Sequence, residues 1–110
     1  MGGWETQVRK GLVELCVMAA LQSGEAYGYE ILRRLAEAEP LAITESTVYP
    51  VLARLAKDGL LAVRVAPSPA GPPRRYYRLT AEGRRHFAGM QSYWKELDAS
   101  VNRLVFGDRP

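Results

Sequence analysis

Six arginines crowd one short stretch of this chain, and arginine at that density is suited to binding phosphate. They lie between positions 64 and 85, where Glu82 is the one acidic residue, although the net charge of all 110 residues is only +3. A guanidinium group can hold a phosphate through two parallel hydrogen bonds. The excess is typical of a surface that contacts nucleic acid, although a solvated surface has the same composition. The arginines are Arg64, Arg74, Arg75, Arg78, Arg84 and Arg85.

Residues that could support catalysis or hold a metal ion are sparse. Cys16 is the single cysteine and lies in an apolar run, which favours a buried filler role. His86 is the single histidine and stands beside two arginines, where a surface position or a phosphate contact is expected. No set of nucleophile, base and acid is visible, and no glycine-rich phosphate loop precedes a helix. We therefore expect a protein that is not an enzyme and that needs neither a metal nor another cofactor.

Length and composition place the chain among ordinary globular proteins. It has 110 residues, of which 47% are hydrophobic and 25% charged, and this is the size and mixture of one domain. Neither a signal peptide nor an apolar stretch of membrane length is visible in the sequence. A cytoplasmic location without membrane contact is therefore expected.

A helix is predicted to begin at Ser46 or Thr47 and to end at Asp58-Gly59. Its apolar positions repeat at i, i+3, i+4 and i+7, through Val48, Val51, Leu52 and Leu55. Small or polar side chains near the start of an exposed helix suit the major groove of DNA, which is about 12 Å wide. The residues expected to face DNA lie opposite the apolar positions or flank that side, and they are Ser46, Thr47, Tyr49, Pro50 and Arg54.

After Gly59 the apolar period changes from 3.6 to 2, which indicates strands. One strand is predicted from Leu61 to Val65 and the next up to Leu79, with a turn rich in proline and glycine from Ala66 to Pro73. The segment is therefore predicted to be a two-stranded hairpin with a stiff tip. The residues beside that tip could reach the DNA backbone or the minor groove, and they are Arg74 and Arg75.

Two further helices are predicted before the DNA-facing helix, one from about Glu5 to Gln22 and one from about Ala26 to Ala38. Ser23-Gly24 and Pro40 are the signals that end them. Three helices followed by a hairpin is the element order of a winged helix-turn-helix. The predicted fold is thus mainly α with a small β-hairpin, and residues 1–80 are expected to form the DNA-binding domain.

The last predicted helix is capped by Thr80 and runs to about Val105. Its apolar residues are spaced alternately by three and four, which is typical of a seam between two packed helices. A chain of this length offers the seam no long internal partner, so a second copy of the chain is the expected partner. Residues 81–110 are therefore predicted to form a dimerisation helix, with a seam at Phe87, Met90, Trp94, Leu97, Val101 and Leu104.

Three segments of the sequence resemble the PadR family of bacterial transcription repressors, in the order that the family has them. They are Tyr27 to Ile31, Ser46 to Pro50 and Gly71 to Thr80. The resemblance implies a winged helix-turn-helix dimer, joined by the C-terminal helix with help from the first helix. With one C-terminal helix, the chain resembles the short subgroup. The resemblance also implies DNA contact through the helix that carries Thr47 and Tyr49. A second contact is implied through the predicted hairpin, called the wing, which carries Arg74 and Arg75.

Trp94 lies at the centre of the predicted seam, where its symmetry mate would be near. The resemblance implies one use for such a pair, since some short members of the family bind flat aromatic drugs between two tryptophans. Stacking and apolar burial both favour planar ligands in such a cleft. Met90, Tyr93 and Trp4 could line the same space. The alternative is that Trp94 simply fills the interface, and the sequence leaves both open.

These features predict a homodimeric, sequence-specific DNA-binding transcription regulator, a repressor that a small aromatic effector releases. Each subunit would bind one half of a palindromic operator in double-stranded DNA. The alternative is a dimeric protein-interaction module that keeps the fold without binding DNA. Its basis is that Arg54 and Lys57 are the only cations on the exposed face of the DNA-facing helix.

Overall fold

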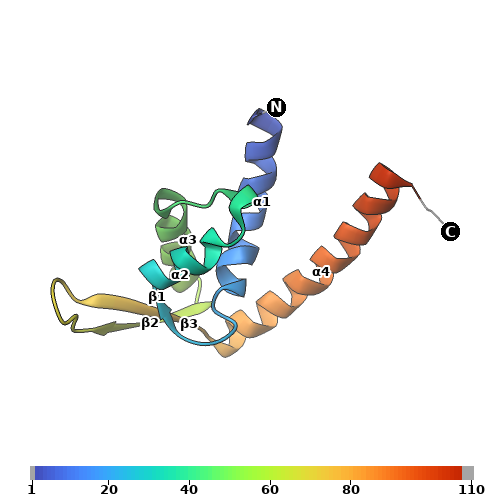
Figure 1. Ribbon diagram of the computed structural model, residues 1–110. Coiled ribbons are helices and arrows are strands. Elements are labelled where there is room, and N and C mark those ends of the chain that lie inside the picture. Colours follow the sequence, from blue (N-terminus) through green and yellow to red (C-terminus); the bar gives the residue numbers. More distant parts are fainter. Residues whose placement is uncertain (1, 108–110) are drawn as a thin grey trace.

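Figure 1 shows a computed structural model, in which residues 2–107 are described. Helices α1, α2 and α3 lie on one side of a small sheet, and α4 leaves the body as a long rod (Figure 1). The molecule is accordingly elongated, with extents of 56 × 31 × 22 Å. The elements in chain order are α1 (Gly2–Ala19), β1 (Ala26–Tyr27), α2 (Gly28–Ala36), the 3-10 helix η1 (Glu39–Leu41), α3 (Glu45–Lys57), β2 (Leu61–Ala66), β3 (Arg74–Leu79) and α4 (Ala81–Phe106).

Helix α1 starts earlier and ends earlier than the predicted Glu5–Gln22. The helix can reach back to Gly2 because glycine only weakens a helix, whereas a proline inside the helix would break it. It ends at Ala19 because the backbone of residues 21–22 makes tighter hydrogen bonds, three residues back. Gly24 then turns the chain at a φ of +131°, a conformation that favours glycine.

The predicted start of the second helix at Ala26 is wrong, because Ala26 and Tyr27 form a strand. This strand pairs antiparallel with β3, so the sheet has three strands in the order β1-β3-β2 instead of the two predicted. Tyr27 keeps extended backbone angles (φ −91°, ψ 167°), and its N–H donates to the Glu30 carboxylate at 3.0 Å. This cap delays the start of α2 to Gly28.

Helix α3 begins before the predicted cap at Ser46 or Thr47, so that prediction is wrong. Thr44 has the extended backbone of an N-cap, and its carbonyl accepts the first hydrogen bonds of the helix. The two residues expected at the cap therefore lie inside the first turn. The predicted end is confirmed, since Asp58 caps the helix and Gly59 follows at a φ of +79°.

The core lies between the three body helices, the side of the sheet that faces them, and the start of α4. Phe87, predicted for the seam between subunits, is 5% exposed and packs inside this core. That prediction was wrong because apolar spacing identifies one side of a helix without showing whether its own subunit or another molecule covers that side. Met90, one turn later, is half-buried against the same core.

The predicted hairpin, or wing, and the predicted cap of α4 are both confirmed. Strands β2 and β3 form the predicted hairpin, and the Thr80 hydroxyl caps α4 by accepting the N–H of Gly83 at 2.9 Å. The fold is thus mainly α with a small sheet, in the winged helix-turn-helix order that was predicted. Within residues 2–107, no helix is both long enough and apolar enough to cross a membrane.

Candidate nucleic-acid interface

The residues of α3 that were predicted to face DNA lie on its exposed side. Its three buried residues belong to the opposite, core-facing side. Pro50 has no N–H to donate to the carbonyl of Ser46, one turn back. The first half of α3 therefore presents polar side chains to the outside, and the Ser46 carbonyl lacks its usual helical donor. The predicted residues, all of them exposed, are Ser46, Thr47, Tyr49, Pro50 and Arg54.

A groove of about 300 Å³ lies between Tyr49 of α3, the junction of β1 with α2, and the start of β3 beside the wing tip. The groove runs along Arg74 and Arg75 of β3, which lie beyond the residues of β3 that pair with β1. Four of its tyrosine and glycine residues were not predicted as site residues, although the segment from Tyr27 to Ile31 carried the family resemblance. The groove is lined by Tyr27, Gly28, Tyr29, Tyr49, Pro73, Arg74, Arg75 and Tyr77.

Gly28 allows the ring of Tyr49 to rest against the start of α2. A Cβ atom at position 28 would overlap that ring, lying 2.8 Å from the phenolic oxygen and 3.0 Å from Cζ. A side chain at this position would therefore push the Tyr49 ring outward. Because Tyr49 remains 42% exposed, part of the ring is open to a ligand in the groove.

Arg74 and Arg75 point to opposite faces of the wing, because successive side chains alternate along a strand. Arg75 is exposed on the face that it shares with Tyr77. Arg74 is half-buried on the other face, where its guanidinium carbon lies 4.4 Å from the centre of the Tyr27 ring. Both line the groove, so the two cations approach it from different sides.

Arg64, on the same wing, forms an ion pair with a carboxylate of the same chain. Its guanidinium donates two hydrogen bonds to the Glu25 carboxylate, at 2.7 and 3.0 Å, and lies 4.6 Å from the centre of the Tyr76 ring. The hydrogen bond from Arg64 lowers the pKa of Glu25 below its usual value. Arg64 thus braces the wing against the loop before β1, so the arginine-rich stretch does not act as one uniform cationic surface.

Arg54 of α3 also forms an ion pair with a carboxylate of the same chain. Its Nη2 donates to Oε1 of Glu14 on α1 at 2.8 Å, and Nε2 of His86 lies 3.1 Å from the other carboxylate oxygen. Burial raises the pKa of Glu14, but the hydrogen bonds and charges of Arg54 and His86 together lower it below its usual value. The partnership was not predicted, because 40 positions separate Glu14 from Arg54.

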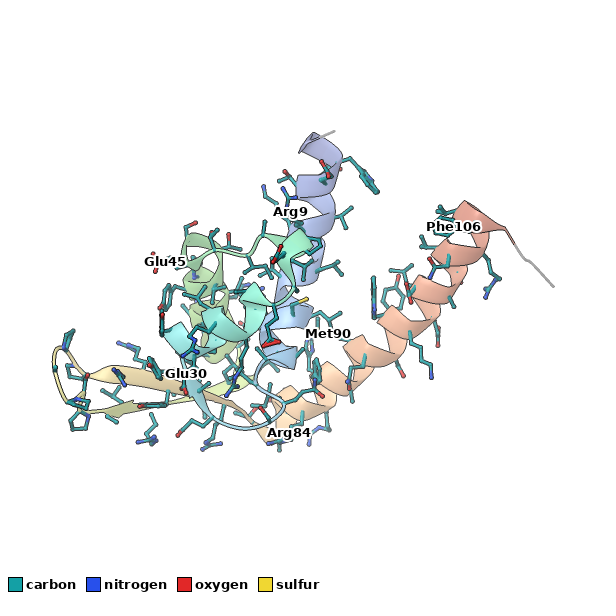
Figure 2. All side chains as sticks on the ribbon, in the orientation of Figure 1. Arg9, Glu30, Glu45, Arg84, Met90 and Phe106 are labelled. Carbon is teal, nitrogen blue, oxygen red and sulfur yellow. The ribbon has the colours of Figure 1, made fainter. Side chains whose placement is uncertain are left out.

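A smaller apolar groove of about 150 Å³ lies between α1 and α4. Figure 2 shows Met90 between the two helices and Phe106 at the far end of α4. Trp94 lines the groove and is 39% exposed, whereas Trp4, predicted to lie near it, is not among the lining residues. Trp4 lies in the first turn of α1 and is 64% exposed. The lining residues are Gly11, Leu12, Leu15, Met90, Tyr93, Trp94 and Leu97.

The exposed helix and adjoining wing define a winged helix-turn-helix protein, and known proteins with this fold place it more closely. The sequence model of the "Transcriptional regulator PadR-like family" matches residues 17–89. The chain therefore belongs to the PadR-like family of transcriptional regulators.

Solved structures show the same likeness. A PadR-like transcription factor from Bacteroides fragilis is 40% identical, with a TM-score of 0.76 over 93% of this chain and 98% of that one. A PadR-like regulator from Bacillus cereus is 30% identical, with a TM-score of 0.80 over 93% and 99% of the two chains. Bacillus subtilis PadR, in complex with operator DNA, shares the fold at a TM-score of 0.65 and 22% identity, over 73% of this chain and 46% of that one.

Proposed function

We propose that this protein is a homodimeric, sequence-specific DNA-binding repressor of transcription. The observation that carries the proposal is the groove where two arginines and several tyrosine rings adjoin the exposed half of α3. Arginine and tyrosine suit a sugar-phosphate backbone, and small polar residues such as Ser46 and Thr47 fit the base edges of the major groove. The complex of Bacillus subtilis PadR with operator DNA supports this use of the shared fold.

The apolar residues along α4 support a dimer. Trp94, Leu97, Val101 and Leu104 are 38–86% exposed in one subunit, and soluble monomers rarely expose an apolar ridge of this kind. A second copy packed on this ridge and on the groove between α1 and α4 would bury it. The paired subunits would then hold their DNA-facing helices about 34–36 Å apart, one turn of a palindromic operator.

This arrangement divides the work between two parts of the chain. Residues 1–80 would form the DNA-binding domain and residues 81–110 the dimerisation helix, with the boundary at the Thr80 cap of α4. Residue 1 and residues 108–110 of this division lie outside the described part of the chain.

Replacing both Arg74 and Arg75 with alanine is expected to flatten the dependence of affinity on salt. The slope of log affinity against log salt should fall by about two, since each phosphate contact contributes about 0.9. Binding to operator and to unrelated DNA should weaken alike, because phosphate contacts carry no sequence information. Anisotropy titrations at several salt concentrations measure this, and the single variants show which face of the wing contributes.

Lys95→Ala is the matched control, because Lys95 is an exposed cation on α4, away from the wing. It should leave the slope unchanged. An unchanged slope in the wing variants would remove the wing from the interface. Failure of the parent protein to shift the promoter DNA beside its own gene would instead favour the interaction module without DNA binding, consistent with the ion pairs that Arg54 and Arg64 form with carboxylates of the same chain.

We further propose that a planar aromatic effector binds beside Trp94 and releases the operator. Trp94 lies in an apolar groove between the helix that would join the subunits and the first helix of the DNA-binding domain. A ligand that prefers one spacing of these helices would shift the spacing of the DNA-facing helices and so change the operator affinity.

Proflavine, a flat tricyclic dye, is expected to quench the fluorescence of Trp94 at micromolar concentrations. The chain has two tryptophans, so Trp4→Phe leaves Trp94 as the single reporter and Trp94→Phe leaves Trp4. Quenching should persist in the first variant and be lost in the second, and Trp94→Phe should still bind operator. Equal quenching of both variants would show that the dye does not select the groove.

A further inference from the structure

One carboxylate joins three helices of this protein. Glu14 of α1 accepts a hydrogen bond from Arg54 of α3 on Oε1, at 2.8 Å, and one from His86 of α4 on Oε2, at 3.1 Å. The side chain of Glu14 is 26% exposed, against 51% for Arg54 and 42% for His86. Glu14 is thus the least exposed of the three residues, and its two partners are closer to the surface.

The shared carboxylate stays ionised across the neutral range. Its pKa is lowered in spite of burial, because both partners donate hydrogen bonds to the charged form. Each oxygen accepts from a different helix, so a change at either partner alters the position and the electrostatic surroundings of the carboxylate that the other partner meets.

We propose that Glu14 is a positioning residue for DNA binding, which holds Arg54 against α1 and ties the orientation of α3 to the start of α4 through His86. This inference rests on the proposed DNA-binding function. Arg54 then acts as a bracket within the subunit, in contrast to the DNA contact predicted from its place on the exposed side of α3. His86 likewise serves the bracket.

The bracket lies on the path between the proposed dimer helix and the DNA-facing helix. His86 is in the second turn of α4, beside Phe87, which packs in the core of the body, and before the exposed part of that helix. A tilt of α4 relative to α1 would therefore reach Glu14 first and α3 next. In a dimer, a small change in this angle alters the placement of both DNA-facing helices.

A double-mutant cycle between Arg54→Ala and His86→Ala tests the bracket. The cycle is run in the parent chain and in the Glu14→Gln background, at one protein concentration. Urea unfolding of the protein without DNA gives the folding equilibrium constant, and anisotropy titrations give operator affinity and its salt slope. Arg75→Ala is the reference for losing a phosphate contact, with a slope change of about 0.9.

Arg54→Ala and His86→Ala should each lower the folding constant by about threefold to fivefold. The double variant should lower it by less than the product of the two single effects. In the Glu14→Gln background each effect should shrink to within about twofold. Operator affinity should fall about threefold to tenfold in Arg54→Ala and in Glu14→Gln, with an unchanged salt slope in both.

Two results would overturn the bracket. The first is that the effects of Arg54→Ala and His86→Ala on the folding constant multiply in the double variant and are the same in the parent chain and in the Glu14→Gln background. The second is a slope reduced by about 0.9 in Arg54→Ala together with tighter operator binding in Glu14→Gln, which would make Arg54 a phosphate ligand. The folding cycle involves no DNA, so a parent protein that shows the coupling but binds no operator would contradict only the proposed function.

Discussion

Replacing Gly83 with alanine is expected to lower the free energy of unfolding by about 2–4 kcal/mol. Gly83 is buried in the first turn of α4, against the backbone that leads into β2. A Cβ atom there would overlap the carbonyl oxygen of Leu60 and lie 3.0 Å from its carbon. That oxygen also accepts the N–H of Thr80 at 3.1 Å, so it cannot withdraw without weakening the junction between the wing and α4.

Gly89→Ala is the matched control for this change. Gly89 lies on the same helix, and apart from its chain neighbours and the adjacent helix backbone no atom of the described residues lies within 4 Å of the methyl group that alanine would add. Alanine favours a helix over glycine by about 0.5–1 kcal/mol, so this variant should be slightly more stable than the parent. Chemical denaturation should thus give opposite signs for the two glycines. A loss below 0.5 kcal/mol at position 83, taken as roughly the error of such a comparison, would show that α4 can move away from Leu60 at little cost.

Replacing Val101 with glutamate is expected to yield monomers at micromolar concentrations and to lower operator affinity by at least about 100-fold. Val101 is 44% exposed in one subunit and belongs to the apolar ridge proposed as the dimer seam. A carboxylate there would be buried without a partner on dimerisation, which is costly. Sedimentation measures the mass of the particle, and anisotropy titration measures the loss of two-site binding to the operator.

Ala99→Glu introduces the same charge at an exposed position on the opposite side of α4. This variant should remain a dimer and bind operator with near-parent affinity. If Val101→Glu sediments as the parent does, the ridge is not the interface, and the subunits must associate through another surface.

Local patterns predicted much of this fold. The core side of α3 follows from residues three and four apart, and its end follows from Asp58-Gly59. Thr80 was predicted as the cap of α4, and its hydroxyl does accept the N–H of Gly83. These features depend on residues within one or two turns of each other, so a short window of sequence contains their cause.

Strand β1 and Phe87 show where such windows fail. Two residues are too few for an alternating pattern, and Ala26 and Tyr27 become a strand only because β3, about 50 positions away, pairs with them. Phe87 continues the apolar spacing of α4, and only the position of the body decides that it packs inside one subunit. Sequence spacing identifies the apolar side of a helix without identifying what covers it.

The candidate interface divides in the same way. The exposed polar side of α3 and the cationic wing could be predicted from residue types and periodicity. The separation of Arg74 from Arg75 onto two faces follows from the observed extent of β3, and the groove that both line needs Tyr27, Tyr49 and the wing to meet. Both the groove and the faces of the wing are therefore properties of the assembled chain.

The type and order of most elements, the apolar side of each helix and the concentration of arginine near the wing depend on neighbouring residues, so they could be predicted before the fold was known. Which arginines pair with a carboxylate of the same chain depends instead on how the elements pack. Arg54 meets Glu14 across 40 positions, Arg64 meets Glu25 across 39, and His86 meets Glu14 across 72. Ion pairs of such separation form when packed helices and strands bring their side chains within hydrogen-bond distance, and no local pattern encodes that approach.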